Sequence, residues 1–230
     1  MRTMARADKR AITYKLAVLV PFTISLALLL RHHVADFTKP ETAFWILILA
    51  AVELFPVPAA RGLQLSLGFP IRLAIIILFP APTAAAIALL GTFDRRELRG
   101  ERTFLAAIFD RSQIALSALC GGVLFHAVAR PSAPAPLLIG AAVAAAAADY
   151  IVNVSLVGGL IWTSSALPIR QVLSAFKLGS PSEFLVSHLG LSFVGTVIAR
   201  LYLSVNLWAV AVFILPVVFG RRMFFRTLVS

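Results

Sequence analysis

The chain has 230 residues, of which 60% are hydrophobic and only 13% are charged. A soluble domain carries about 25% charged residues, so the composition excludes an ordinary water-soluble globular protein and indicates an integral membrane protein. The net charge is +11, but the cations form short clusters between apolar runs, and this distribution argues against nucleic-acid binding.

The first apolar segment, 16–30, follows a basic stretch at 1–15. This order resembles a secretory signal, but histidines stand where a cleavage site needs small residues, which predicts an uncleaved first helix. About 20 apolar residues cross a bilayer as a helix, so the later segments predict one all-α domain, 1–230, built as a polytopic transmembrane helix bundle. Those later segments are 42–58, 65–80, 82–93, 104–129, 136–163, 184–204 and 207–220.

The segments 65–80 and 82–93 are short, and the sequence Pro80-Ala81-Pro82 separates them. Proline removes a backbone donor and breaks a helix, so these segments are either two short or tilted spans or a re-entrant pair. The expected number of spans is therefore about six to eight. The stretch 167–179 predicts a loop helix or, as the alternative, an amphipathic helix at the inner membrane surface.

The distribution of cations predicts the orientation. With eight crossings and a cytoplasmic N-terminus, 15 of the 21 Lys and Arg residues lie inside, 3 lie outside and 3 lie within apolar runs. This bias follows the positive-inside rule. It predicts a multi-pass protein of the inner (plasma) membrane, with the N-terminus (1–15) and a short tail (221–230) in the cytoplasm. A re-entrant pair in place of the two short spans would leave every other segment in the same orientation.

Two polar residues, Asp149 and Asn153, lie four apart in the apolar segment 136–163 and share one helical face. An acid at membrane depth is costly and usually faces a bundle interior or a wet cavity. The alanine-rich first half of this segment lets a neighbouring backbone approach closely. We therefore expect the segment to line an internal site.

The segment 104–129 carries a second polar face, because Asp110, Gln113 and Ser117 follow i, i+3, i+7 spacing. We expect Asp110 and Gln113 to form the ligand-binding site together with Asp149 and Asn153. For Asp110 a purely structural role is the alternative.

Other polar and aromatic residues have predominantly structural interpretations. Glu53 and Arg72 lie on consecutive segments and are expected to pair, fixing helix register, with ligand contact as the alternative. Aromatic residues near the ends of the apolar segments predict an aromatic belt at the membrane interface. These aromatic residues are Trp45, Trp162, Tyr202 and Trp208.

The sequence lacks the motifs of phosphate-binding loops, zinc peptidases, dinucleotide-binding folds and serine hydrolases. Its histidines are adjacent or isolated, without the spacing of helical metal ligands. We therefore expect no catalytic residues, no metal site, no cofactor and no enzymatic activity.

Three stretches carry a family resemblance: LSLGFPIRLAIIILFPAPTAAAIALLGTF, FDRSQIALSALCGGVLF and DYIVNVSLVGGLI. They resemble the membrane sensor modules N-terminal to bacterial HD-GYP and diguanylate cyclase domains and, more distantly, the substrate-binding S components of energy-coupling-factor vitamin transporters. The resemblance covers about 42–225 and implies an S-component-like helical fold. S components dock through an AxxxA motif on their first span, whereas here this spacing occurs at Ala84/Ala88 and Ala141/Ala145.

These observations favour a non-enzymatic, sensor-like membrane module that binds a small or amphiphilic ligand. We expect the lipid bilayer as its surroundings, a separate protein partner or an oligomer for its output, and no nucleic acid. A transporter, or the substrate-binding subunit of one, is the alternative. A membrane enzyme or carrier for a lipid-linked substrate ranks third.

Overall fold

A computed structural model of the chain describes residues 2–54, 57–58, 64–65, 68–165, 171, 181–206 and 208. This part of the chain is helical except for its connections and one short antiparallel pair of strands, so the predicted all-α class is confirmed. The strands are β1 (Val57–Pro58) and β2 (Gln64–Leu65). The helices are α1 (Arg2–Leu30), η1 (Val34–Thr38), α2 (Pro40–Leu54), α3 (Gly68–Leu78), α4 (Ala81–Gly91), α5 (Arg95–Leu98), α6 (Phe104–Val128), α7 (Ala135–Ser164) and α9 (Pro181–Val205).

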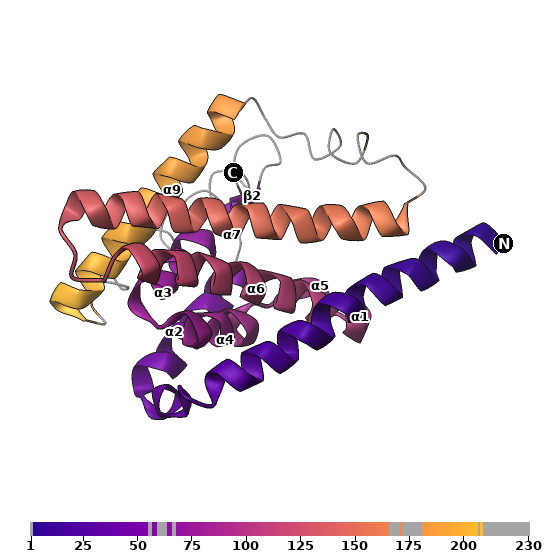
Figure 1. Ribbon diagram of the computed structural model, residues 1–230, viewed down its shortest axis with the longest axis horizontal. Coiled ribbons are helices and arrows are strands. Elements are labelled where there is room, and N and C mark those ends of the chain that lie inside the picture. Colours follow the sequence, from indigo (N-terminus) through magenta and orange to yellow (C-terminus); the bar gives the residue numbers. More distant parts are fainter. Residues whose placement is uncertain are drawn as a thin grey trace, which may run out of the picture.

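Three helical stretches of the described residues are long and apolar enough to cross a membrane: Lys9–Leu30, Phe104–Val128 and Ala135–Ser164. They run roughly along the long axis of the molecule, and α9 crosses α7 (Figure 1). The remaining apolar helices are shorter, so fewer clear spans are present than the six to eight that the sequence predicts. These shorter helices are Gly68–Leu78, Ala81–Gly91 and Leu189–Val205.

Helix boundaries agree best with the sequence where proline or a capping residue marks them. The α6 helix begins after Thr103, whose side chain accepts a hydrogen bond from the backbone N–H of Ala106. The α7 helix begins after Pro134 and has proline in its first turn. By contrast, α1 begins at Arg2, so the basic stretch from Arg2 to Lys15 is part of the first helix.

Three predicted segments fall largely outside the described residues. They are the loop helix at 167–179, of which only Gln171 is described, the last apolar segment at 207–220, of which only Trp208 is described, and the tail at 221–230. Their predicted structures remain predictions.

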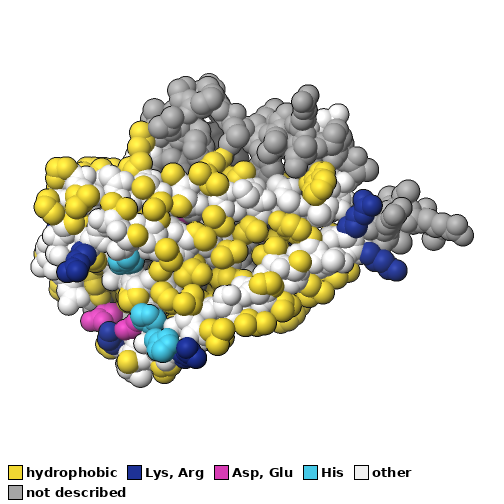
Figure 2. Space-filling view, viewed as in Figure 1, with side chains coloured by type: hydrophobic (Ala, Val, Ile, Leu, Met, Phe, Trp, Pro, Cys, Tyr) yellow, Lys and Arg dark blue, Asp and Glu magenta, His cyan; other side chains and the backbone are white. Residues whose placement is uncertain are grey.

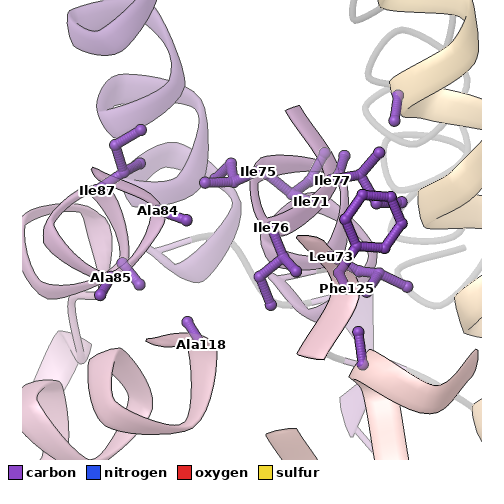
Figure 3. Packing of buried hydrophobic residues seen from close by; sticks show 14 of the residues in the cluster. Ile71, Leu73, Ile75, Ile76, Ile77, Ala84, Ala85, Ile87, Ala118 and Phe125 are labelled. Carbon is purple, nitrogen blue, oxygen red and sulfur yellow. The ribbon is translucent and has the colours of Figure 1, made fainter. Parts of the chain in front are cut away.

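The centre of the bundle is α3, which is almost completely buried. Leu73, Ala74, Ile75 and Ile77 have no exposed surface. A helix that is apolar on all sides needs neighbours on all sides, and α2, α4, α6, α7 and α9 supply them. Figure 3 shows the isoleucines of α3 between the small residues of α4 and the side chains of α6.

The predicted break between α3 and α4 is confirmed at Pro80. This residue has an extended backbone conformation and precedes α4, and Pro82 lies in the first turn, where proline is tolerated. The carbonyl group of Phe79, just before the break, lies 2.7 Å from the Nε2 atom of His126. A side chain of α6 thus satisfies a backbone acceptor at the break.

The bundle has two polar ends. The histidine end comprises 31–39, 79–82 and 126–134. The arginine end comprises 92–103 and the first turns of α6. Figure 2 shows hydrophobic side chains along α1, α6 and α7, charged and histidine side chains at the histidine end, and cations near the start of α1 on the opposite side of the view. An apolar belt between two charged ends is the surface that a bilayer requires.

At the histidine end, Asp36 joins η1 to α4. Its carboxylate accepts hydrogen bonds from Lys39 at 2.8 Å and Thr83 at 2.9 Å, and it lies 3.3 Å from a ring nitrogen of His33. Its backbone carbonyl accepts a bond from the Thr42 hydroxyl group at 2.6 Å. The bond from Lys39 is the largest of the effects that lower the pKa of Asp36, and together they outweigh the opposing effect of burial.

Glycine allows α6 to approach two neighbours. A Cβ atom on Gly121 would lie 3.0 Å from the carbonyl oxygen of Ala145 in α7, and one on Gly122 would lie 2.9 Å from Cβ of Ala81 in α4. Neither position leaves room for a side chain, so α6 packs closely against both helices. By contrast, a Cβ atom on Gly190 would meet nothing within 4 Å, so that glycine is not a packing point.

The predicted aromatic belt is wrong for Trp45. This side chain is completely buried, and its ring packs edge-on against Tyr202 of α9 at a centroid separation of 5.2 Å. Trp162 and Trp208 are exposed by 51% and 76%, as expected of residues facing a membrane interface. The position of Trp45 near the start of α2 suggested an interface, but α9 covers it.

A matched pair of glycine variants tests the packing of α6 on α4. The variant Gly122→Ala is expected to lower the free energy of unfolding by about 1–3 kcal/mol, because the new methyl group meets the backbone of Ala81. In Gly140→Ala the new methyl group meets nothing, and helix propensity predicts a gain of up to about 1 kcal/mol. Thermal unfolding in mild detergent measures both. Equal changes would contradict the close contact.

The contact made by Asp36 predicts a dependence of stability on pH. Because the folded-state pKa is lowered, its contribution is complete above the ordinary carboxyl pKa of about 4 and is lost as the pH falls through the lower folded value. Asp36→Asn is therefore expected to lower the unfolding temperature at neutral pH, and the difference from wild type should shrink in acid. A difference independent of pH would exclude a role for this carboxylate charge.

Candidate functional site

A buried ion pair connects α3 and α7 in the middle of the bundle. Nη2 of Arg72 donates to Oδ2 of Asp149 at 3.0 Å, and the two residues are only 7% and 1% exposed. A buried charge without a partner is costly, so each residue requires the other. The guanidinium carbon of Arg72 also lies 5.6 Å from the ring centroid of Phe69, within cation–π distance.

The same carboxylate binds α6 through Ser117. The hydroxyl group of Ser117 donates to Oδ1 of Asp149 at 2.8 Å and also lies 2.9 Å from the carbonyl oxygen of Ile114. One helical turn further along α6, Gly121 lies against the α7 backbone. The absence of a side chain at Gly121 lets the helices approach closely enough for Ser117 to reach Asp149.

A second polar contact lies one helical turn from the first on both helices. Nε2 of Gln113 donates to Oδ1 of Asn153 at 2.8 Å. Gln113 is four residues before Ser117, and Asn153 is four residues after Asp149, so antiparallel α6 and α7 present two polar pairs in succession. Gln113 is 8% exposed and Asn153 is half-buried.

Asp110 lies on the same face of α6 but nearer the arginine end. Its carboxylate pairs with Arg102, and the two side chains are 31% and 26% exposed. Exposure therefore increases along one side of α6, from fully buried Ser117, through Gln113, to half-buried Asp110. We call these residues, with Arg72, Asp149 and Asn153, the polar row.

The structure places all four predicted ligand-binding residues in the polar row, although not in one shared contact. Gln113 bonds Asn153, Asp149 lies one turn away, and Asp110 pairs with Arg102. Whether any of them binds a ligand stays a prediction.

The sequence did not identify the partner of Arg72. Glu53 was expected, but the ion pair shown is with Asp149, and Glu53 acts on Arg72 through a further electrostatic interaction. The signal that pointed to Arg72 was a charge inside an apolar run. Both α2 and α7 contact α3, so the choice between the two acids depends on how their side chains pack, and a single sequence does not show this.

Tyr14 of α1 packs against both α6 and α7, on the side of the polar row that is nearer the arginine end. Its hydroxyl group donates to the carbonyl oxygen of Leu156 at 3.1 Å, and its ring lies 6.1 Å from the ring of Phe109. Gly159 leaves room for the phenol group, since a Cβ atom there would overlap it.

Two further arginines lie at opposite ends of the bundle. Arg111 binds Glu97 of α5 and lies 4.1 Å from the ring centroid of Phe93, at the arginine end. Arg200 donates to the carbonyl oxygen of Ala133, at the histidine end. The side chain of His188 lies outside the described residues.

The polar row offers hydrogen-bonding groups rather than a set of metal ligands. Among the residues that the structure describes, no group of three His, Cys, Asp or Glu side chains could hold a metal ion. The row offers one buried cation, carboxylates, amides and a hydroxyl group, which suit hydrogen-bonded recognition of a small polar group.

The comparisons with known proteins give no family. No family model matches the chain, and no curated protein or solved structure matches it significantly. The resemblance to sensor modules and S components therefore stays a prediction.

A double-mutant cycle tests the ion pair. Arg72→Gln and Asp149→Asn are each expected to lower the free energy of unfolding by about 3–5 kcal/mol, because each leaves one buried charge without its partner. The double variant is expected to recover much of the loss, since both charges are gone. Thermal unfolding of the four proteins in mild detergent gives the coupling. Additive losses would show that the two side chains do not interact.

Proposed function

We propose that the protein is a non-catalytic, sensor-like membrane module that binds a small or amphiphilic ligand at the polar row and acts through a protein partner. The observation that carries this proposal is the graded exposure of the row. Its polar contacts continue from the buried pair of Arg72 and Asp149 to half-buried Asp110 at the arginine end. Polar groups inside a bundle usually face a cavity, a pathway or one another, and this row reaches the surface.

In this proposal the bundle lies in the inner membrane with six to eight spans. The histidine end faces outward and the arginine end faces the cytoplasm, as the positive-inside rule requires of a cluster that includes Arg96, Arg99 and Arg102. Both α3 and α4 have 11 residues, or about 16 Å of helix, roughly half the hydrocarbon thickness.

The contacts at both ends of α4 support a crossing rather than a shallow hairpin. Thr83, in its first turn, bonds Asp36 at the histidine end. Beyond its last turn, Phe93 packs under Arg111 at the arginine end. The chain thus connects the two ends with a short helix and a few extended residues, an arrangement tolerated inside a membrane only where protein surrounds it.

Transport is the second candidate, and the contact between Ser117 and Asp149 favours it. A buried acid that accepts a bond from a hydroxyl group, in a row that reaches the surface, is also the arrangement of a proton pathway. Reconstituted liposomes distinguish the two functions. Solute or proton flux that disappears in Asp149→Asn indicates transport, whereas ligand binding without flux supports the module.

Native mass spectrometry tests ligand binding. Protein purified from membranes in mild detergent is expected to retain a small molecule, and Gln113→Leu/Asn153→Leu is expected to lose it, because both amides are replaced by apolar side chains of similar size. Ser204→Ala, at an exposed position of α9, is the control and should keep the bound mass. A wild-type protein carrying lipid alone, or equal retention by the double variant, would contradict the proposal.

A further inference from the structure

We infer that Arg72 is the ligand-recognition residue of the polar row, that the ligand carries a carboxylate, and that Asp149 holds the place of that carboxylate when no ligand is bound. This inference rests on the proposed function and specifies its ligand. The observation behind it is that one N–H donor of the Arg72 guanidinium group has no acceptor among the described residues.

The guanidinium group of Arg72 has a donor without an acceptor. The Nε atom is buried and makes no hydrogen bond among the residues that the structure describes, although the side chain is only 9% exposed. An unsatisfied buried donor is costly and requires an explanation. A ligand atom that accepts from Nε would supply this explanation.

The geometry of the ion pair explains why this donor is left over. Nε and one Nη group of an arginine form a planar fork that matches the two oxygens of a carboxylate. Asp149 uses only Nη2 of that fork, through Oδ2, while its Oδ1 accepts a bond from Ser117 of α6. The carboxylate of Asp149 is therefore shared between two helices, and it does not complete the fork of Arg72.

The carboxylate of a ligand is not held by Ser117, so it can accept from both Nε and Nη2 of Arg72. The guanidinium group lies over the ring of Phe69, which covers one of its faces. A ligand is therefore expected to bind at the edge of the group. One helical turn towards the arginine end lies Asn153, whose side-chain oxygen accepts a bond from Gln113 and whose amino group is a further donor. The polar row thus provides the donors that an anion needs.

The inference assigns Asp149 the role of a competitor. A ligand carboxylate and Asp149 compete for the same Nη2 donor, so removal of the aspartate charge should strengthen anion binding. If the ligand were instead a cation or a proton bound at Asp149, the same substitution would abolish binding. The sign of the effect of Asp149→Asn therefore decides between the two chemistries.

The experiment measures thermal stabilisation of the purified protein in neutral detergent by three probes. Octanoate represents an amphiphilic acid, acetate represents a water-soluble acid, and octanol is the matched neutral compound. A ligand that binds only the folded state raises the unfolding temperature in proportion to its affinity. Stabilisation by octanoate or acetate, but not by octanol, is expected. If only acetate stabilises the protein, the ligand reaches the site from water. If only octanoate does, the ligand reaches it from the membrane.

Variants make the result specific to Arg72. Asp149→Asn should lower the half-saturating acid concentration by about tenfold or more, since the competing carboxylate is gone. Arg72→Gln/Asp149→Asn, which removes both charges and should fold, is expected to lose the response. Arg200→Gln removes an arginine bound to a backbone carbonyl at the histidine end and should keep it.

The outcomes separate this inference from the function on which it rests. No stabilisation by either acid, or loss of the response in Asp149→Asn when that variant is folded, overturns the carboxylate. If Asp149→Asn does not fold, an unchanged response in the double variant overturns it equally. A bound mass that depends on Gln113 and Asn153 in native mass spectrometry would still support the binding module. Loss of both results would overturn the function itself.

Discussion

The architecture depends on the ion pair between Arg72 and Asp149. Removing two charges from water costs of the order of several kcal/mol per ion, and this cost is offset only when the charges remain close together. If α3 moved by one turn along α7, the pair would separate, whereas apolar contacts between these helices would simply exchange partners. Ser117 extends the same constraint to α6. A single carboxylate therefore fixes the relative positions of three helices.

Much of the fold could be predicted from the sequence. Long apolar runs bounded by proline or a capping residue gave the limits of α6 and α7, and Pro80 gave the break before α4. The short elements η1 and α5 were missed, because a few polar residues carry no hydrophobic period. The basic start of α1 was taken for a flanking region, since charges near an apolar run mark a membrane boundary, although lysine and arginine are also good helix formers.

The candidate site could be predicted only within each helix. Helical spacing places Asp149 with Asn153, and Asp110 with Gln113, on common faces, and the structure shows these faces meeting. Which side chains meet between helices depends on packing that the sequence does not express. The helices that carry Glu53 and Asp149 both contact α3, and only the packing of their side chains gives the ion pair to Asp149. Trp45 was placed at a surface that α9 covers.

The separation of these contacts along the chain bears on how the proposed membrane bundle would assemble. Arg72 and Asp149 are 77 residues apart, and Tyr14 and Leu156 are 142 apart. During synthesis α3 therefore emerges from the ribosome well before its counter-ion in α7. Placing an arginine at the centre of a bilayer costs about 2.5–3.5 kcal/mol of insertion free energy even on the translocon scale. Lipid insertion of α3 is therefore unfavourable until α7 supplies the carboxylate of Asp149. The first helix, which has few buried side chains, can make its contact with Leu156 only after α7 has been synthesised.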